Sequence, residues 1–445
     1  MSKLDKKRIG RRAALKTLGG GAAAAAFTLG GAPWNFAIGQ SQRTVRIWTT
    51  QSAPAQIKVY DTIIKMFEAK NPKIKIALEL VSDDDVFPKL TAAHAAGQPP
   101  EICSNTNTYV PGALHGRGLV ENMADVAKAV GDFTPRSLEV YNEGGFQFSL
   151  GAALTVISAM WVRTDLFAAE GLDVPKHWDD YLVAAKKLTK RGVYGTALPY
   201  GKGAFANRMM DMFIRQAGGD IVAPDMSVVF DNPGTHRALE FMAEARAFAP
   251  PGANNYSFGE TLNAFVSGAT AIGVYSGRTL SNIHAQNPSL KDKVKAAFYS
   301  YPRDGQRYWV CGYDAFFINK GAKVNTDEAK IFAEFFYQPE PYTLFLHGAP
   351  AHNLPVVDKV ARSATYNDNP VLNQHKADID TLMAIAAEGW VNIKPTAKHP
   401  FIFKMGDIYG SNIMAEVLQR VVVEKQTPKA AAAWGQDRIA EIMKA

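Results

Sequence analysis

The chain has 445 residues, of which 47% are apolar and 20% are charged. This length suggests two or three domains, and the composition is that of an ordinary folded protein. It excludes a disordered tail, a collagen-like fibre and a membrane protein with many spans. A chain of this size buries enough surface to fold without disulfides or structural metals.

The formal net charge of +7 is concentrated in the N-terminal segment. Residues 1–39 contain seven lysines and arginines and one acid, whereas the remaining residues carry 42 basic and 41 acidic side chains. A body with a net charge of +1 lacks the basic surface that binds a phosphate backbone. We therefore expect no nucleic-acid partner.

The N-terminal segment has the pattern of an export signal. Arg11 and Arg12 lie in a basic region and precede an uncharged stretch at 17–42 that is rich in alanine and glycine. The pair resembles a twin-arginine signal, although Gly10 and Ala14 stand where Ser or Thr and Phe are usual. The alternative is a membrane anchor, but the alanine and glycine content is too weakly apolar to favour lipid.

Small residues indicate where such a signal would be cleaved. Ala37 and Gly39 fit the −3 and −1 positions, so the mature chain is expected to begin near Gln40. No cysteine precedes Cys103, which excludes a lipid-anchored N-terminus. We therefore expect a periplasmic protein that is free of the membrane.

The chain has two cysteines, Cys103 and Cys311, too few for a disulfide scaffold or a zinc cluster. In an oxidising compartment the two can pair, and two buried thiols are the alternative. The sequence leaves both possibilities open.

The mature chain begins with alternating strand and helix patterns. Residues 44–49 predict a strand, and apolar residues at helical spacing predict a helix over 55–70 that ends before Pro72. A strand at 73–80, a helix at 85–96 and a strand from residue 100 follow. This order predicts a mostly parallel sheet with helices on its faces.

A long uncharged apolar run at 154–162 is typical of a buried strand. Further strands are expected at 270–274, 294–299 and 312–318, and helices at 179–190, 207–216, 233–248, 327–337, 339–347, 376–388, 413–423 and 428–444. Because no flexible linker separates the two sheet-containing halves, we expect the strands themselves to join them.

Several phrases occur in the order known from one protein family. They are FEAKNPKIKI at 67–76, AAGQPPEI at 95–102, WVRTDLF at 161–167, PKHWDD at 175–180, QAGGD at 216–220, ALEF at 238–241 and FVSGATA at 265–271. In this order the sequence resembles the extracellular solute-binding proteins of ABC importers, in the carbohydrate group that includes maltose-binding protein.

The resemblance implies an α/β, two-lobe periplasmic-binding-protein fold of type II, with mostly parallel sheets and a hinge of crossover strands. It implies an N-terminal lobe at 40–152 with 312–354 and a C-terminal lobe at 153–311 with 355–445. Crossings are expected near 150–154, 310–313 and 354–356. The implied protein is a monomeric, non-catalytic binder that closes on a mono- or oligosaccharide and delivers it to a membrane permease.

An exported hydrolase is the rival hypothesis, and a binder of a small non-sugar anion is another. The sequence contains no G-x-S-x-G elbow, H-E-x-x-H helix or phosphate-binding loop. His347 and His352 do not share a helix face with a third ligand, so we expect no metal and no other cofactor.

An acidic run at 83–85 has two interpretations. Its carboxylates can cap a helix by accepting from free N–H groups. The resemblance places Asp84 where the family often has a carboxylate that accepts sugar hydroxyls.

Polar and aromatic residues in loops at strand ends are candidates for sugar recognition, which needs fixed polar groups and planar apolar surfaces. The expected ligand-binding residues are Thr50, Gln51, Asp84, Asn105, Thr108, Tyr200, Asn207, Arg208, Tyr275, Ser276, Arg278, Tyr313, Asp314 and Trp390. Arg278 stands where maltose-binding relatives carry a stacking Trp. Together with Arg208 it would suit an acidic group, while a neutral oligosaccharide remains the default.

Overall fold

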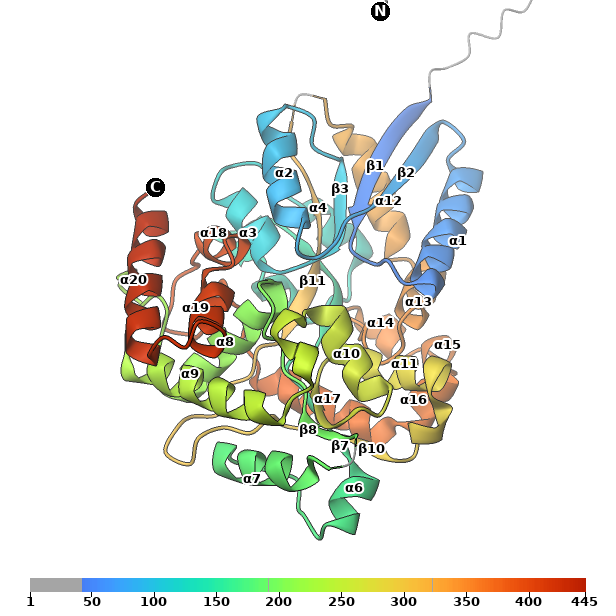
Figure 1. The fold of residues 1–445 in the computed structure, drawn as a ribbon. Coiled ribbons are helices and arrows are strands. Elements are labelled where there is room, and N and C mark those ends of the chain that lie inside the picture. The colour runs from blue at the N-terminus through green and yellow to red at the C-terminus, as the bar shows by residue number, and fades with distance from the viewer. Residues whose placement is uncertain (1–41, 191, 322) are drawn as a thin grey trace, which may run out of the picture. The chain divides into compact units, whose positions relative to one another are not determined.

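Residues 42–445 fold around two separate β-sheets, which lie in the upper and lower parts of Figure 1. The computed structural model describes residues 42–190, 192–321 and 323–445, so the predicted export signal lies outside the described residues. We call the parts around the two sheets lobe 1 and lobe 2.

The sheet of lobe 1 has the strand order β2-β1-β3-β11-β6, and that of lobe 2 has the order β10-β7-β9-β8. A hairpin of β4 and β5 completes the strands. Their bounds are β1 (Arg43–Thr49), β2 (Ile74–Leu80), β3 (Ile102–Thr106), β4 (Asn142–Glu143), β5 (Phe146–Gln147), β6 (Leu150–Thr155), β7 (Met160–Arg163), β8 (Tyr194–Thr196), β9 (Thr270–Val274), β10 (Val294–Ala297) and β11 (Gly312–Ile318).

Helices cover both sheets. Those of lobe 1 are α1 (Pro54–Lys70), α2 (Val86–Ala95), α3 (Tyr109–His115), α4 (Ala124–Val130), α5 (Pro135–Glu139), α12 (Thr326–Phe336), α13 (Pro339–His347), α14 (Asp358–Ala361) and α15 (Ala364–Asn367). Those of lobe 2 are α6 (Thr164–Ala169), α7 (Trp178–Leu188), α8 (Ala204–Gln216), α9 (Pro233–Ala245), α10 (Phe258–Val266), α11 (Arg278–Gln286), α16 (Pro370–Gln374), α17 (Lys376–Glu388), α19 (Ile413–Val422) and α20 (Pro428–Lys444).

The elements predicted in the first part of the chain are confirmed, and the side chains explain their form. Helix α1 buries Tyr60, Ile63 and Phe67 on one face and ends before Pro72, where proline disfavours further helix. Its neighbour β1 buries Val45 and Ile47. Strand β11 and the helices α13, α17 and α20 have the predicted bounds.

The apolar run at 154–162 is not one strand, and here the prediction is wrong. It contains the end of β6 in lobe 1 and β7 in lobe 2, with a turn between them. Both strands are buried on both faces, so the run shows no change in hydrophobic pattern where the chain passes between the sheets. The first crossing therefore falls at 156–159.

The α/β class and the two-lobe fold are confirmed, and each sheet contains parallel strands. In lobe 1, β1 pairs in parallel with β2 and β3. The sheets are mixed rather than mostly parallel, because β11 pairs antiparallel with both β3 and β6. Among the strand pairs of lobe 2 that the structure describes, β8–β9 is the parallel one.

The two cysteines are buried and unbonded. Cys103 lies opposite Phe317 in the β3–β11 register, whereas Cys311 lies six residues earlier in the chain, just before β11. At about 3.3 Å per residue this offset separates them by roughly 20 Å, far beyond the ~7 Å limit for a disulfide. The buried-thiol alternative is therefore the correct one.

Helix α18 (Met405–Gly410) packs on α3 of lobe 1 and also on α8 and α19 of lobe 2. Close packing of Gly406 on Ala113 and of Gly410 on Phe87 leaves no room for larger side chains. This segment thus contacts both lobes, and the predicted residue boundaries of the lobes stay a prediction.

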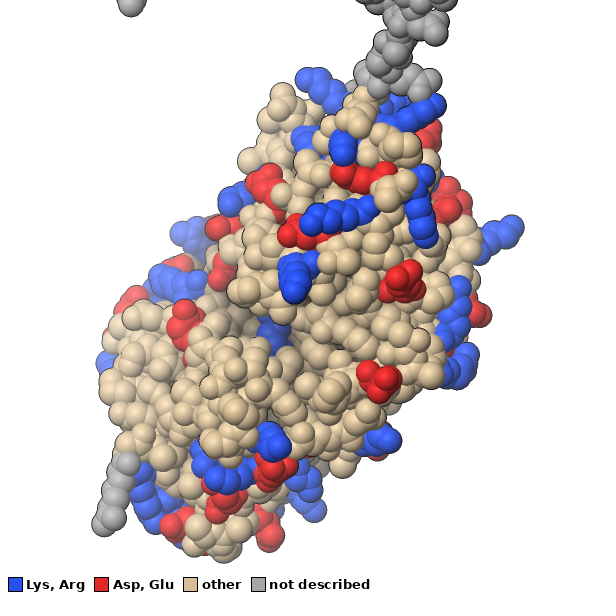
Figure 2. Space-filling view, turned by 90° about the vertical axis from the view of Figure 1, so that its right-hand side faces the viewer, with Lys and Arg blue, Asp and Glu red and all other residues tan. Residues whose placement is uncertain are grey.

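Figure 2 shows basic and acidic side chains interspersed over one face. No helix among the described residues combines the length and the apolar character needed to cross a bilayer.

Candidate functional site

A cavity of about 40 Å³ lies between the two lobes, beside the crossover strands β6 and β11. Its lining consists of Thr50, Gln51, Asp83, Asn105, Asn107, Thr155, Ile157, Arg208, Phe258, Tyr275, Arg278, Asp314 and His352. Since one water needs roughly 10–15 Å³ in such a measure, the volume corresponds to about three waters. A larger solute can enter only when the lobes part.

Lobe 1 contributes polar side chains at the carboxyl ends of its parallel strands. Thr50 and Gln51 follow β1, and Thr50 Oγ1 donates to the carbonyl of Asn105 at 2.5 Å. Asn105 has a left-handed backbone with φ of 62° and is the extra residue of a bulge in β3. A bulge turns a side chain away from the regular alternation, which here brings Asn105 to the cavity.

Asp314 is held at the centre of the cavity wall by both neighbouring strands. It accepts hydrogen bonds from Asn105 Nδ2 at 2.9 Å and from Thr155 Oγ1 at 3.1 Å. The β11–β3 and β11–β6 ladders both shift register next to Asp314. Because the two bulges interrupt the regular ladders here, the hydrogen bonds from Asn105 and Thr155 set the orientation of the Asp314 carboxyl.

Lobe 2 contributes an arginine and an aromatic wall. Arg208 on α8 is 7% exposed and donates to the side-chain carbonyl of Asn107 in lobe 1. Its guanidinium carbon lies 5.9 Å from the centre of the Phe258 ring. Phe258 stacks on Phe205 with 4.7 Å between ring centres and meets Tyr275 edge-on. An aromatic face of this kind suits the C–H face of a sugar ring.

A second arginine stands at the start of α11. Arg278 donates from a terminal nitrogen to Gln51 Oε1 of lobe 1 at 3.0 Å. The preceding Gly277 packs so closely on the carbonyl of Ala351 that a Cβ atom would collide with it. This approach places His352 beside Ser276, and the two share a hydrogen bond of 2.7 Å.

Polar contacts that include those of Arg208, Arg278 and Asp84 hold the lobes together around the cavity. Arg208 bonds to Asn107, and Arg278 bonds to Gln51. Asp84 of lobe 1 accepts from the backbone N–H of Ala204, the first residue of α8, at 2.9 Å. The structure is therefore a closed one, in which side chains of each lobe satisfy groups of the other.

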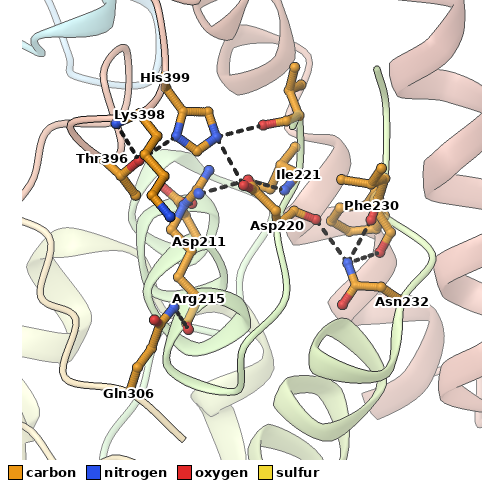
Figure 3. Close-up of polar contacts among 12 residues, drawn as sticks. Asp211, Arg215, Asp220, Ile221, Phe230, Asn232, Gln306, Thr396, Lys398 and His399 are labelled. Carbon is orange, nitrogen blue, oxygen red and sulfur yellow. Dashed lines mark hydrogen bonds and ion pairs between the residues drawn. The ribbon is translucent and has the colours of Figure 1, made fainter. Parts of the chain in front are cut away.

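A buried ionic network around Arg215 holds helix α8 in place (Figure 3). Arg215 lies 2.7 Å from both Asp211 and Asp220, and it is only 2% exposed. Asp220 also bonds to His399 at 2.9 Å, and Asp211 accepts from Tyr409 at 2.8 Å. The network ties α8 to the loop before α18, so it positions the helix that carries Arg208.

Burial shifts the titration of the acidic groups in the cavity. Loss of hydration raises the pKa of Asp83 to about 6, against the attraction of Arg208 and Arg278. The same cause raises the pKa of Asp314 to about 7, against the attraction of Arg208. Burial lowers the pKa of His352 well below its usual value, and both arginines act in the same direction.

The structure brings seven of the predicted site residues to the cavity: Thr50, Gln51, Asn105, Arg208, Tyr275, Arg278 and Asp314. The sequence analysis missed the lining residues Asp83, Asn107, Thr155, Ile157, Phe258 and His352. The acidic run pointed to the correct loop, but the choice of Asp84 over Asp83 depends on which side chain turns inward. Periodicity does not show this in a loop.

Four other predicted residues do not line the cavity and have protein partners instead. Thr108 donates to the carbonyl of Tyr313, and Ser276 is bonded to His352. Asn207 bonds to Tyr409, Asn412 and Ala415 and thereby holds α8 to the C-terminal helices. Tyr200 is fully buried and donates to the carbonyl of Met242.

Trp390 and Tyr313 do not line this cavity, and their role in ligand binding stays a prediction. Both line a separate pocket of about 590 Å³ together with Leu154 and Arg136. Successive side chains of a strand point to opposite faces. Leu154 and Tyr313 therefore face this pocket, whereas their neighbours Thr155 and Asp314 face the cavity.

The described residues contain no group of three or more His, Cys, Asp or Glu side chains arranged to hold a metal ion. The cavity is instead a set of hydrogen-bond donors, acceptors and charges around an aromatic wall. This arrangement can bind a small polar solute reversibly.

Comparison with known proteins agrees with this architecture. Over 382 residues the chain is 24% identical to "Putative ABC transporter periplasmic-binding protein YcjN" of Escherichia coli (strain K12), covering 82% of this chain and 85% of that protein. The maltose-bound MalE3 structure of T. maritima superposes with a TM-score of 0.77 at 16% identity, covering 90% of this chain and 99% of the other.

A ribitol-bound ABC transporter solute-binding protein of Agrobacterium radiobacter K84 also has a TM-score of 0.77, at 18% identity and with 91% and 99% of the two chains covered. The family model described as bacterial extracellular solute-binding protein matches residues 49–342. The chain belongs to the bacterial extracellular solute-binding protein family.

Proposed function

We propose that this protein captures a small sugar or sugar-like solute between its lobes and delivers it to the permease of an ABC importer. The observation that carries the proposal is the closed cavity, which both lobes line with polar side chains and which Phe258 bounds on one side. YcjN is named as a periplasmic-binding protein of an ABC transporter, and similar structures hold maltose and ribitol.

The residues of the cavity suit the recognition of hydroxyl groups. Asp314, Asp83 and Asn105 offer acceptors, while Arg208, Arg278 and Asn107 offer donors. Asn105 Oδ1 and the Nε atoms of both arginines are buried without a hydrogen-bond partner. Because buried polar groups are normally satisfied, these three atoms are candidates for contacts with the solute.

In this closed arrangement the cavity has room for about three waters, so a long oligosaccharide does not fit and even a single sugar ring requires the lobes to part. The contact between Asp84 and α8 and the two arginine contacts enclose the cavity from both lobes. A solute that touches both lobes stabilises this closed arrangement, whereas one that binds a single lobe does not. The proposal includes a monomeric, non-catalytic protein that needs no cofactor.

We also propose that the protein reaches the periplasm through the twin-arginine route and carries no lipid. The support is the sequence pattern around Arg11 and Arg12 and the family description as extracellular.

A thermal-shift screen of the purified protein against monosaccharides, disaccharides, polyols and sugar acids tests the function. A solute that binds the folded form at a hundredfold excess over its Kd adds about 2.7 kcal/mol to the free energy of unfolding. Mass spectrometry of the incubated solute and assays with chromogenic glycosides provide the control. Release of product would indicate a hydrolase, and no shift with any sugar would contradict the proposed solute class.

A further inference from the structure

The charge state of the solute can be inferred from the two arginines of the cavity. Arg208 and Arg278 both come from lobe 2, and each donates to a neutral amide of lobe 1. Within the described ranges, neither guanidinium forms an ion pair with a carboxylate, in contrast to Arg215 in the network behind α8. The Nε atoms of both arginines are buried and have no hydrogen-bond partner.

A buried positive charge without a counter-charge is costly, and proteins normally pair it or place it at a ligand. The carboxyl of Asp314 does not fill this role, because it is bonded to Asn105 and Thr155. Since burial raises the pKa of Asp314 to about 7, this group is only partly ionised near neutral pH. Asp83 also lines the cavity and attracts both arginines, but burial raises its pKa to about 6. Near neutral pH the two carboxyls therefore offset the two guanidiniums incompletely, and the cavity retains a positive excess.

We propose that the solute is a small polyhydroxy carboxylate, such as a uronic or aldonic acid, whose carboxylate lies between the guanidiniums of Arg208 and Arg278. This inference rests on the proposed function and narrows its solute class. Guanidinium groups bind carboxylates through paired N–H donors. The remaining hydroxyls face Asp83, Asn105 and the Phe258 wall.

One negative charge fits the cavity better than two. A phosphate ester would place a second negative charge beside Asp83 and Asp314, which line the same small space. Like charges at short range in a buried site repel strongly. A carboxylate supplies the missing counter-charge with one negative charge fewer than a phosphate ester, and therefore with less repulsion.

Titration calorimetry with matched probes tests the inference. The acids are D-gluconate, D-glucuronate and D-galacturonate, the neutral counterparts are D-glucitol, D-glucose and D-galactose, and D-glucose 6-phosphate is the dianion. We expect at least one acid to bind ten or more times tighter than its neutral counterpart. Arg278→Gln should weaken that acid more than tenfold and its neutral counterpart less than threefold.

The matched control is Arg420→Gln. Arg420 also has a buried Nε without a partner, but it stacks on Trp434 at 3.8 Å outside the cavity. This variant should keep the wild-type preference for acids. Arg208→Gln should act like Arg278→Gln, and if it fails to fold, the more exposed Arg278 decides the outcome.

Neutral sugars that bind as tightly as the acids would overturn the inference and leave the proposed function standing. Tighter binding of D-glucose 6-phosphate than of any acid would also overturn it. Binding of no probe at all would contradict both the inference and the proposed function.

Discussion

At the scale of single residues, the cavity depends on side chains that leave the regular pattern of their strands. Asn105 adopts a left-handed backbone, and the ladders on both sides of Asp314 shift register. A left-handed backbone is tolerated better by Asn than by most residues with a side chain. These local departures bring amide and carboxyl groups together that a regular sheet would direct to different faces.

The raised pKa of Asp314 predicts a specific dependence of stability on pH. Between about pH 4 and pH 7 the folded state binds more protons than the unfolded state, so this group makes the free energy of unfolding fall as pH rises. Asp314→Asn removes the titration. The stability of the wild type relative to Asp314→Asn should therefore decrease from pH 5 to pH 8 in ligand-free thermal melts.

Asp304→Asn is the control for this experiment. Arg237 holds the pKa of the exposed Asp304 below its usual value through a hydrogen bond. The pKa of Asp304 then lies below pH 5 in both the folded and the unfolded state. The difference in stability between the wild type and Asp304→Asn should therefore stay constant from pH 5 to pH 8. If the difference in stability between the wild type and Asp314→Asn is also constant over this range, Asp314 is not a buried carboxyl that binds a proton on folding.

Asp84 predicts a second effect at this scale. Its carboxylate lies at the N-terminus of α8 across the interface, with Ser257 Oγ 3.4 Å from its second oxygen. A carboxylate at a helix N-terminus contributes about 1 kcal/mol. Asp84→Ala should therefore weaken every solute about fivefold, because it destabilises the closed state without touching the solute.

The measurement is the ratio of dissociation constants for three different solutes in wild type and Asp84→Ala. A constant ratio supports an interlobe contact. A ratio that changes with the hydroxyl pattern of the solute would instead make Asp84 a ligand-binding residue, as the sequence resemblance implied.

At the scale of elements, α8 links the cavity to the packing of lobe 2. Its N-terminal half carries Arg208, and its C-terminal half carries Asp211 and Arg215 in the buried network of Figure 3. Every residue of α8 is buried, so the partners in the network take the place of water around its charged side chains. The position of Arg208 therefore depends on contacts that lie behind the cavity.

Removal of Arg215 should be strongly destabilising. Arg215→Met leaves Asp211 and part of Asp220 buried without their cationic partner, which typically costs about 3–5 kcal/mol. Arg303→Met, which removes an exposed pair with Asp180, should cost less than about 1 kcal/mol. Urea unfolding of both variants checks this prediction, and equal losses would contradict the importance of the network.

The elements also show how far the sequence could predict the fold. Strand β11 and helix α17 have the predicted bounds because Gly and charged residues mark their ends, Gly312 and Lys320 around the strand and Lys376 and Gly389 around the helix. The run at 154–162 misled the prediction because both of its strands are buried on both faces. A change of sheet leaves no mark in such a pattern.

The same reasoning applies to the candidate site. Asn105 lies near the end of β3, Arg208 near the start of α8, and Arg278 at the start of α11. Ligands of α/β folds bind at this edge, so the sequence could indicate these residues. The sequence could not assign Trp390 to a pocket. Trp390 lies beside Leu154 and Tyr313, and only the register of β6 and β11 shows that these two side chains point away from the cavity. Loop residues such as Asp83 and Asn107 need the three-dimensional path of the chain.

At the scale of the whole molecule, export and binding are separate properties that can be tested independently. If Arg11 and Arg12 direct the folded chain to the twin-arginine route, their joint replacement by lysine should leave the precursor in the cytoplasm. Cell fractionation followed by mass determination measures this. Undiminished export of the double variant would contradict the assignment, and the purified cytoplasmic form should still bind solute.

The central claim is that a solute binds between the lobes and needs contacts from both. The most direct measurement is the dissociation constant of the best solute from the thermal-shift screen for Gln51→Ala of lobe 1 and Phe258→Ala of lobe 2. Each variant removes one cavity-lining side chain, and we predict that each weakens binding about tenfold while the ligand-free melting temperature changes little. Wild-type affinity in either variant would contradict binding in this cavity.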